Sequence, residues 1–346
     1  MAVDRVRIGV VSAANIGRRV VIPSILRARN AELVALASSS DAGERFLRET
    51  ELATADGRPL RDALRLHRSY AELLADPDVD AVYIPLPNHL HAEWSVRAAD
   101  AGKHVLCEKP AALDAAETAA MIDHCTGRGV VWMEAFMYRF HPQWQVVRRL
   151  LGEGAIGELR AVVAIFTFTV RDPQNVRRVP EYGGGSLYDV GSYCVNVSRW
   201  MFGRAPVSVS GSSVRSREGV DEEFRGVLDF GHGGSALILS SLSQPYRHHV
   251  RLLGTEGDIT VPQAFVLRPD DAVSVIRTDA GGREEAHPVE PADEYRLEVE
   301  DFADCVLAGR PPEVVSHAET LANMRMIDAL YASAESGAAV ALDPGG

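Results

Sequence analysis

The chain has 346 residues, which is enough for two domains that each bury a core. Its formal net charge of −12 argues against a nucleic-acid partner, because contacts with phosphates require basic patches. No apolar run reaches the roughly 18 residues of a membrane-spanning helix, so we expect no membrane partner. The longest apolar run, residues 161–170, is predicted to be a strand.

The cysteines are widely separated, at Cys107, Cys125, Cys194 and Cys305, and none belongs to a CxxC pair. The N-terminal residues lead directly into a predicted strand and lack the apolar region of a signal peptide. Both observations favour a cytoplasmic protein, in which the reduced thiols serve as small core residues.

The N-terminal pattern is strand, helix, strand, with predicted strands at residues 5–11 and 32–38. The turn after the first strand reads Ser12-x-Ala14-x-x-Gly17 where a dinucleotide-binding fold carries G-x-G-x-x-G. Serine and alanine are small enough to let a pyrophosphate approach the start of the helix, whose N–H groups favour anions. The turn therefore predicts a dinucleotide site, although a generic strand-to-helix turn would have a similar sequence.

The end of the second strand bears on the choice of cofactor. An NAD site usually places an acidic residue there, on the ribose 2′-hydroxyl. This chain has Ser38, Ser39 and Ser40, followed by Asp41 and Arg45. Serine hydroxyls and an arginine suit a 2′-phosphate, so NADP is favoured. Asp41 is expected to cap the next helix but remains a candidate ribose ligand, which keeps NAD as an alternative.

Residues 54–66 are predicted to be a surface excursion, and residues 79–84 the next core strand. This strand leads into the loop 85–91, which two prolines hold stiff. His89 and His91 lie in this loop without a third ligand nearby in the sequence, so no metal site is expected.

Residues 102–110 begin with a turn glycine, run through a predicted short apolar strand at residues 105–107 and end in Glu108-Lys109-Pro110. In a doubly wound α/β sheet, ligands bind outside the carboxyl ends of the strands, where Lys109 would meet them. The alternative is a solvated ion pair at the end of a strand. One more helix and a strand at residues 130–133 complete the alternation of strands and helices. Residues 1–135 are therefore predicted to be a dinucleotide-binding domain with a doubly wound parallel sheet.

The pattern changes in residues 136–346, which are predicted to form a separate α+β domain with a large, mostly antiparallel sheet. The predicted strands are residues 158–170, 207–215, 224–230, 235–241, 248–254 and 272–277, and the predicted helices are 185–201, 293–308 and 316–336. The loop 171–185 carries three arginines, which would face a substrate diphosphate or simply be solvated.

The helix 185–201 carries the best partner for Lys109. Tyr193 follows Asp189 by four residues, so the two side chains share a helix face. A phenol has a reference pKa of about 10, and a nearby ammonium lowers that pKa toward the range where acid–base catalysis is efficient. Asp189 would orient the lysine or a substrate hydroxyl. The alternative is that Tyr193 is an ordinary core tyrosine.

Several motifs occur together in one order: Pro87-Asn88-His89, Glu108-Lys109-Pro110, Glu134-Ala135, Arg139-Phe140-His141-Pro142 and Asp189-x-Gly191-x-Tyr193. In this combination the chain resembles the Gfo/Idh/MocA family of oxidoreductases over nearly its whole length. It is most similar to the branch with NADP-dependent D-xylose dehydrogenases, dimeric dihydrodiol dehydrogenases and deoxysugar ketoreductases.

The resemblance implies an N-terminal Rossmann domain that binds NADP and a C-terminal domain for substrate binding and oligomerisation. The sheet of the second domain would be open-faced and would form a homodimer or homotetramer, and no metal is implied. The resemblance makes Lys109, Tyr193 and Asp189 the catalytic residues and adds His141 to them as a substrate ligand. The implied cofactor ligands are Gly9, Ser12, Ala14, Asn15, Ile16, Ser38, Ser39, Arg45, Leu86, Asn88, His91, Glu108, Lys109 and Arg139.

The expected activity is hydride transfer between NADP(H) and a carbinol or carbonyl carbon of a sugar, with Tyr193 as acid/base assisted by Lys109. One alternative with the same catalytic pair is reduction of a nucleotide-linked keto-deoxysugar. A second is a regulatory protein that binds NADP without catalysis, which would be expected to lack Lys109 or Tyr193. A third, NAD-assisted glycoside hydrolysis, would call for an NAD-type acidic residue and an altered Glu-Lys-Pro.

Overall fold

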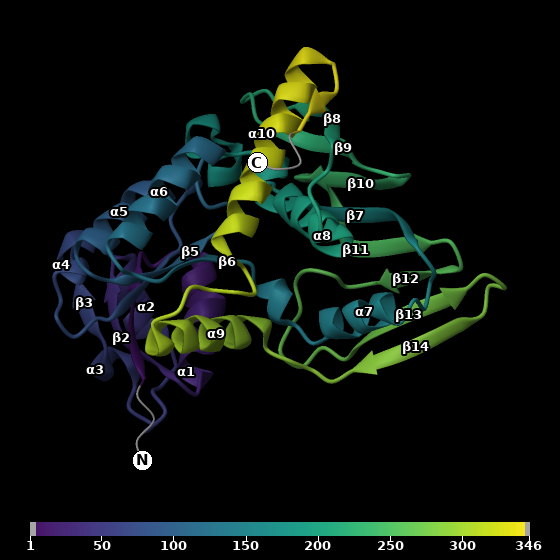
Figure 1. Ribbon diagram of the computed structural model, residues 1–346. Coiled ribbons are helices and arrows are strands. Elements are labelled where there is room, and N and C mark those ends of the chain that lie inside the picture. Colours follow the sequence, from purple (N-terminus) through teal and green to yellow (C-terminus); the bar gives the residue numbers. More distant parts are fainter. Residues whose placement is uncertain (1–4, 343–346) are drawn as a thin grey trace. The chain divides into compact units, whose positions relative to one another are not determined.

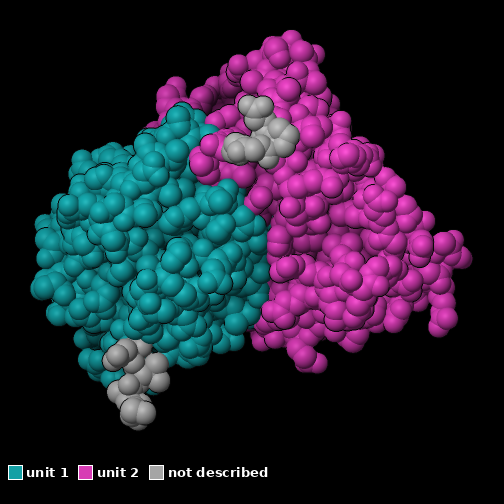
Figure 2. All heavy atoms as spheres, viewed as in Figure 1, with its two compact units in different colours: residues 1–140, 293–320 teal, residues 141–292, 321–346 magenta. Residues whose placement is uncertain are grey.

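The structure, a computed structural model, describes residues 5–342 (Figure 1). The chain forms two compact units, which Figure 2 shows in different colours. Unit 1 contains the chain up to Phe140 together with the returning segment Asp293–Thr320, and unit 2 contains His141–Ala292 and the chain from Leu321 onward. The sequence pattern places a boundary at residue 135 and assigns residues 293–320 to the second domain, whereas in the structure this segment belongs to unit 1.

The core of unit 1 is a six-stranded parallel sheet with the strand order β3-β2-β1-β4-β5-β6. Its strands are β1 (Val6–Val11), β2 (Ala31–Ala37), β3 (Arg65–His67), β4 (Ala81–Ile84), β5 (His104–Glu108) and β6 (Trp132–Ala135). The order reverses between β1 and β4, which makes the sheet doubly wound and confirms the predicted fold class. The edge strand β3 lies at the end of the predicted surface excursion.

Helices follow most strands of unit 1. They are α1 (Ile22–Arg27), preceded by the π-helical turn Gly17–Val21, α2 (Ala42–Glu49), α3 (Leu60–Ala63), α4 (Tyr70–Leu74), α5 (His91–Asp100), α6 (Ala115–Gly127) and α9 (Glu294–Ala308). Short 3₁₀ turns cover Asn88–Leu90 and Met137–Phe140. The helix α5 packs against β4 and β5, and α9 packs against α1, β1 and β2.

Polar contacts explain why α9 returns to unit 1. Asp293 caps α9 by accepting a hydrogen bond from the Arg296 N–H, and it also accepts one from the Arg27 guanidinium on α1 at 2.6 Å. Further along, the Asn30 side chain donates to the Glu300 carbonyl at 2.8 Å. The periodicity of a helix identifies its apolar face, but it does not identify the unit that this face covers.

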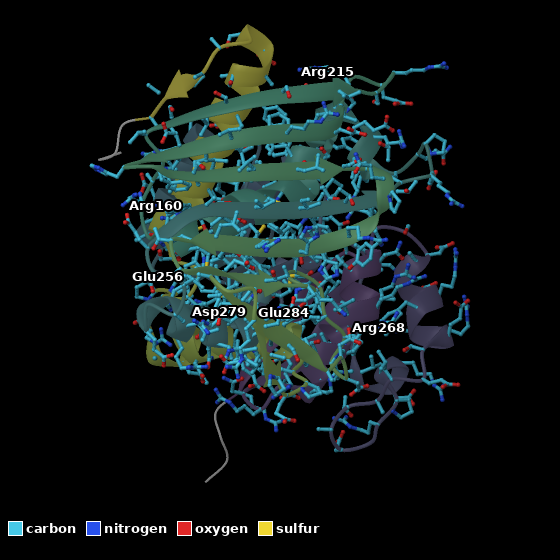
Figure 3. The ribbon with its side chains drawn as sticks, turned by 90° about the vertical axis from the view of Figure 1, so that its right-hand side faces the viewer. Arg160, Arg215, Glu256, Arg268, Asp279 and Glu284 are labelled. Atoms are coloured by element: carbon cyan, nitrogen blue, oxygen red, sulfur yellow. The ribbon has the colours of Figure 1, made fainter. Side chains whose placement is uncertain are left out.

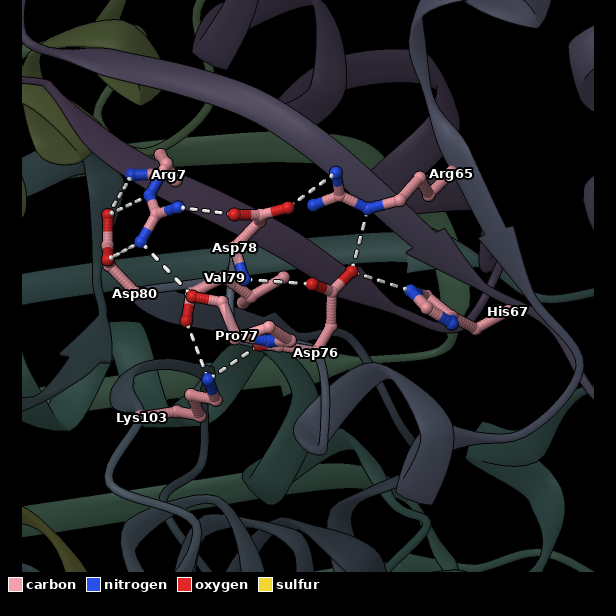
Figure 4. A network of polar contacts seen from close by, with 9 residues as sticks. All are labelled: Arg7, Arg65, His67, Asp76, Pro77, Asp78, Val79, Asp80 and Lys103. Atoms are coloured by element: carbon pink, nitrogen blue, oxygen red, sulfur yellow. Dashed lines mark hydrogen bonds and ion pairs between the residues drawn. The ribbon is translucent and has the colours of Figure 1, made fainter.

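A second polar network connects the amino ends of β1, β4 and β5 in unit 1 (Figure 4). Arg7 at the start of β1 pairs with Asp78 and Asp80 at 3.1 and 2.7 Å. The Lys103 ammonium, just before β5, donates to the carbonyls of Asp76 and Val79 at 2.8 and 2.7 Å. Because all six strands are parallel, this network lies at the edge of the sheet opposite to their carboxyl ends. It therefore stabilises the sheet away from the predicted cofactor side.

Unit 2 contains a nine-stranded sheet with the order β14-β13-β12-β11-β7-β10-β9-β8-β15, antiparallel except where β7 pairs with β10. The strands are β7 (Leu159–Thr169), β8 (Ser208–Arg215), β9 (Asp221–Gly231), β10 (Gly234–Ser241), β11 (Ser243–Gly254), β12 (Gly257–Val261), β13 (Val273–Asp279), β14 (Glu284–Val289) and β15 (Val340–Ala341). The predicted, mostly antiparallel second sheet is confirmed.

The helices of this part are α7 (Gln143–Gly152), α8 (Ser192–Phe202) and α10 (His317–Ser336), and α10 begins in unit 1. A π-helical turn, Leu187–Gly191, leads into α8, and 3₁₀ turns cover Val176–Arg178 and Pro180–Tyr182. The helix α8 packs on β7 and β10. Figure 3 looks onto the opposite face of the sheet, which no helix from the described part of unit 2 covers. Within residues 5–342, no helix is long and apolar enough to cross a membrane.

Candidate active site

The carboxyl ends of the unit 1 strands carry most of the predicted cofactor ligands. Since the strands are parallel, the loops that follow β1, β2, β4, β5 and β6 leave the sheet at one edge. The order reversal between β1 and β4 lies in the middle of this edge. In open α/β sheets this position is where ligands bind.

The turn after β1 has the shape of a glycine-rich turn although it contains serine. Ser12 has φ +89°, a conformation that L residues other than glycine rarely adopt, and its N–H donates to the Ala37 carbonyl at 3.0 Å. Ala14 and Asn15 follow at the start of the helix, where the Arg18 N–H donates to the Ala14 carbonyl. The backbone of this turn therefore has a conformation typical of glycine, and its contact with a dinucleotide pyrophosphate stays a prediction.

Gly9 has a packing role in this structure. A Cβ atom added to it would lie 3.1 Å from Leu73 of α4, so the missing side chain lets α4 approach β1 closely. A Cβ on Gly17 would only make an ordinary 3.6 Å contact with Pro85 and Val10. That Gly9 also contacts the cofactor stays a prediction.

Replacing Ser12 by glycine is expected to raise the free energy of unfolding by about 1 kcal/mol, because positive φ costs a residue with a Cβ about 1–2 kcal/mol. Ser12→Ala keeps the Cβ atom and is the matched control, for which no gain is expected. Urea denaturation of both variants measures the difference. An equal stability of the glycine and alanine variants would show that the turn is unstrained.

At the end of β2, the predicted serines have different surroundings. Ser38 is buried, donating to the Ser40 carbonyl at 2.8 Å and accepting from the Gly43 N–H at 3.2 Å, so its hydroxyl holds the turn. Ser39 and Arg45 are exposed. Within residues 5–342, the Arg45 guanidinium has no ion-pair partner. Ser39 and Arg45 are thus exposed polar groups at this strand end, and their contact with a ribose 2′-phosphate stays a prediction.

His91 joins the loops that follow β4 and β5. It is fully buried, and its two ring nitrogens lie 2.8 Å from the carbonyl oxygens of Pro110 and Leu86. Burial lowers the pKa of His91 to about 4, against the opposing effect of the two carbonyls. Its ring therefore positions the Leu86–Asn88 loop against the Glu-Lys-Pro turn.

Glu108 and Lys109 end β5. The Glu108 carboxylate accepts a hydrogen bond from the Tyr83 hydroxyl at 2.6 Å, and the Lys109–Pro110 peptide bond is cis. Lys109 and Lys103 are the only lysines of the chain, and the other basic residues among the 36 Lys and Arg are arginines. Lysine carries a compact ammonium that arginine does not reproduce. Both lysines border the same short strand, one at each end.

Glu134 lies beside this strand end, at the end of β6. It is fully buried and pairs in register with Cys107 of β5. Burial raises the pKa of Glu134 to about 8, an effect that the Lys109 charge opposes and the Glu108 charge reinforces. Lys109 therefore has a buried acidic neighbour that composition and spacing do not reveal.

Arg139 and His141, the two remaining predicted ligands near this region, are both buried. The Arg139 guanidinium donates to the Val314 carbonyl at 2.7 Å and pairs with Glu319 at 3.2 Å, so it holds the returning segment in unit 1. His141 belongs to unit 2, where its Nδ1 accepts a hydrogen bond from the Gln143 N–H. Burial lowers the pKa of His141 to about 4, which keeps the ring neutral.

In unit 2, Asp189 lies in the π-helical turn and Tyr193 in the first turn of α8. The Asp189 carboxylate accepts a 2.6 Å hydrogen bond from Nε of Arg177, an arginine of the predicted loop 171–185. The Tyr193 ring packs edge-on against Phe166, with 5.4 Å between the ring centroids. Asp189 is thus held by its hydrogen bond with Arg177, and the Tyr193 phenol packs against an aromatic side chain.

Sequence reasoning missed Asp221, a buried residue of β9 that anchors this turn. Its carboxylate accepts hydrogen bonds from the Leu187 N–H, the Ser186 hydroxyl and the Tyr331 hydroxyl at 2.7, 2.8 and 2.8 Å. Gly185, with φ +119°, has no room for a Cβ atom, which would lie 2.1 Å from the same carboxylate. The signal was weak, since an aspartate at a strand start is ordinary in a sequence.

The two units carry different chemistry. The carboxyl edge of the unit 1 sheet offers a dinucleotide cradle and one ammonium, and unit 2 offers a phenol and a carboxylate on adjacent helical turns. Among residues 5–342, no group of three or more His, Cys, Asp or Glu side chains is arranged to hold a metal ion.

Both units contain segments that match known protein families. Residues 6–136 match the family described as "Oxidoreductase family, NAD-binding Rossmann fold", and residues 144–260 match the "GFO/IDH/MocA C-terminal domain". The chain is 41% identical over 338 residues to D-xylose 1-dehydrogenase (NADP(+)) 2 of Haloferax volcanii, a match that covers 97% of this chain and 99% of the relative.

Solved structures agree with the sequence matches. KijD10, a 3-ketoreductase from Actinomadura kijaniata in complex with NADP and TDP-benzene, superposes with a TM-score of 0.88 at 29% identity, covering 95% of this chain and 98% of that one. An aldose-aldose oxidoreductase from Caulobacter crescentus gives a TM-score of 0.85 at 28% identity, covering 98% and 100%. The family predicted from the motifs is confirmed: the chain belongs to the GFO/IDH/MocA family and is an oxidoreductase with an NAD-binding Rossmann domain.

Proposed function

We propose that the protein is an NADP(H)-dependent oxidoreductase that moves a hydride between nicotinamide and a carbinol or carbonyl carbon of a sugar. The observation that carries this proposal is the carboxyl edge of the unit 1 sheet, where the glycine-type turn at Ser12 follows β1 and Lys109 follows β5, the strands on either side of β4. The names of the relatives, which include an NADP-dependent D-xylose dehydrogenase and a ketoreductase with bound NADP, support the same reading.

NADP fits the residues at the end of β2. Exposed Ser39 and Arg45 would hold the 2′-phosphate, and the backbone of the turn at Ser12, Ala14, Asn15 and Ile16 would hold the pyrophosphate. The loops at Leu86, Asn88 and Glu108 would line the nicotinamide side, with His91 and Ser38 positioning them. Asp41 is exposed as well, so NAD remains the alternative cofactor.

In the proposed mechanism, the bound cofactor supplies or accepts the hydride. The Tyr193 phenol gives a proton to the substrate oxygen during reduction and takes it back during oxidation. The Lys109 ammonium favours the phenolate and polarises the substrate oxygen. Asp189, fixed by Arg177, orients a substrate hydroxyl, and His141 is a further substrate ligand.

The main alternative is reduction of a nucleotide-linked keto-deoxysugar, as the KijD10 relative suggests. A diphosphate would need available cations, and two of the three arginines in the loop 171–185 are already engaged. Arg177 pairs with Asp189, and Arg178 donates to the Val170 carbonyl at 2.6 Å and lies 3.4 Å from Glu222. This pairing favours an uncharged sugar, although Arg171 is exposed.

A substrate screen separates these readings. Free aldoses with NADP⁺ and dTDP-linked keto-sugars with NADPH are assayed by the absorbance of the reduced nicotinamide. We expect turnover with at least one free aldose. Turnover with the dTDP-sugar alone would favour the alternative, and NADPH binding without turnover on any sugar would favour a regulatory protein. Retention of both Lys109 and Tyr193 argues against that last reading.

We also propose that the uncovered face of the unit 2 sheet forms a homodimer or homotetramer interface. Leu237 of β10 is 48% exposed, Val227 beside it on β9 is 45% exposed, and Val163 of β7 is its other neighbour in register. Exposed apolar patches of this kind mark interaction surfaces. Light scattering on the purified protein should give the mass of two or four chains, and the mass of a single chain would contradict this assignment.

A cytoplasmic location is proposed from the thiols. All four cysteines are free and buried, and burial raises the pKa of each. Such thiols are small core groups without a structural disulfide, which suits a reducing compartment.

A further inference from the structure

His248 is a buried histidine of β11 that no step of the proposed mechanism uses. Its ring lies on the same face of the sheet as Phe166, its partner in register on β7, with 5.6 Å between the ring centroids. Phe166 in turn packs against Tyr193 at 5.4 Å. Phe265 contacts Tyr193 at 5.5 Å, and its N–H donates to Nδ1 of His248. His248 and Tyr193 therefore contact the same two residues, Phe166 and Phe265, all within unit 2.

The hydrogen bond from Phe265 fixes the tautomer of His248. Because Nδ1 accepts the backbone N–H at 3.1 Å, the proton of the neutral imidazole must sit on Nε2. Burial lowers the pKa of His248 to about 4, reinforced by His249 and opposed by Asp271, so the ring is neutral at pH 7. His248 thus presents a single, oriented N–H donor.

That donor has no use within the protein. In the described part of the chain Nε2 has no hydrogen-bond partner, and it is not among the buried atoms that lack one, so it reaches solvent. His248 is only 7% exposed, whereas the adjoining Tyr246 ring, 4.9 Å away, is 51% exposed. An oriented N–H beside an accessible aromatic face is the arrangement of a small-molecule site, which is mostly apolar with a few placed polar groups.

We propose that His248 donates a hydrogen bond from Nε2 to a hydroxyl oxygen of the sugar substrate, while the sugar ring packs against Tyr246. This assignment rests on the proposed function, and it names the polar group that would select an uncharged, polyhydroxylated substrate. A neutral imidazole offers one hydrogen bond and no charge, so it suits a hydroxyl better than a phosphate, which prefers a guanidinium. His248 would be a specificity-determining residue.

Two substitutions separate this role from a structural one. His248→Asn places an amide oxygen near the position of Nδ1, which keeps the Phe265 hydrogen bond but deletes the Nε2 donor. His248→Gln places an amide N–H near the position of Nε2 and loses the Phe265 bond. His249→Asn is the matched control, because successive side chains of a strand point to opposite faces.

The probe is the free aldose that the wild-type protein turns over fastest, beginning with D-xylose. For His248→Asn we expect KM to rise about tenfold, as for one lost hydrogen bond to a substrate, with Tm and NADPH binding unchanged. His248→Gln should lower Tm but keep KM closer to the wild-type value. A wild-type KM in His248→Asn together with a raised KM in His248→Gln would overturn the assignment and leave a structural role.

Deoxy sugars keep the assignment testable even if His248→Asn does not fold. The monodeoxy sugar that lacks the hydroxyl bound by Nε2 should have a kcat/KM about tenfold lower than the parent sugar with the wild-type protein. The His248→Gln variant should show a similar ratio between the two sugars. In a folded His248→Asn variant the deoxy sugar and the parent sugar should have equal kcat/KM values, because the hydrogen bond is already absent. Equal losses for every deoxy position would contradict a single donor. Failure of the wild-type protein to turn over any sugar would instead contradict the proposed function.

Discussion

Replacing Lys109 by alanine is expected to lower kcat by about 10³-fold while NADPH binding is retained, because the ammonium acts mainly on the charge that develops at the substrate oxygen. Replacing Tyr193 by phenylalanine should cost a similar factor. That change removes only the phenol oxygen and keeps the ring against Phe166 and Phe265, whose centroids lie 5.4 and 5.5 Å away. Tryptophan fluorescence measures cofactor binding, and the absorbance of the reduced nicotinamide measures turnover.

Tyr188→Phe is the control for this pair of variants. It removes the same atom from the turn before α8, where the ring packs against Tyr331 at 5.0 Å, and no loss of turnover is expected. Near-normal turnover in both Lys109→Ala and Tyr193→Phe would end the proposed mechanism. A loss of turnover in Lys109→Ala but not in Tyr193→Phe would mean that a group other than Tyr193 acts as the acid/base.

The Arg45→Ala variant should bind NADPH about 10- to 100-fold more weakly and bind NADH as the wild type does, since a charged hydrogen bond contributes about 1.5–3 kcal/mol. Arg45 is exposed at the end of β2, in the first turn of α2, where its N–H donates to the Asp41 carbonyl. The 2′-phosphate is the only group by which the two cofactors differ, so the ratio of the two dissociation constants isolates the contact.

Arg48→Ala provides the matched control for that ratio. Arg48 is also exposed and lies on the same helix, one turn further from β2, so its loss should leave the preference unchanged. Fluorescence titrations of the two variants with NADPH and NADH give four dissociation constants, one for each variant with each cofactor. An equal weakening of both cofactors in Arg45→Ala would show that Arg45 does not read the 2′-phosphate, and Asp41 would then favour NAD.

The sequence predicted the parts of the fold that repeat a simple pattern. Strands such as Val6–Val11 and Ala31–Ala37 are buried along most of their length and read as apolar runs that are interrupted only at Arg7 and Glu32. The strands β3, β12 and β14 were missed because they are short or rich in charged residues, as Arg65–His67 and Glu284–Val289 show. The place of α9 was missed because its contacts with Arg27 and Asn30 join distant parts of the chain.

The sequence predicted the position of those candidate site residues that come directly after a strand. Lys109 could be placed at the carboxyl edge of a parallel sheet from the pattern alone. The partners that fix the side chains could not, because they come from other strands and loops: Arg177 for Asp189, Asp221 for the turn at Leu187, and Phe265 for His248. At Gly9 the sequence suggests a cofactor contact, whereas the structure shows a packing role, because the missing side chain leaves room for Leu73.

Transfer of a label from sugar to cofactor tests the central claim most directly. The protein is incubated with NADP⁺ and an aldose that carries deuterium on the carbon to be oxidised, and the mass of the reduced cofactor is measured. We predict that each NADPH formed carries one deuterium, and that neither Lys109→Ala nor Tyr193→Phe forms it at a comparable rate. Reduced cofactor without the label, or no reduced cofactor with any sugar, would contradict hydride transfer between a sugar carbon and nicotinamide.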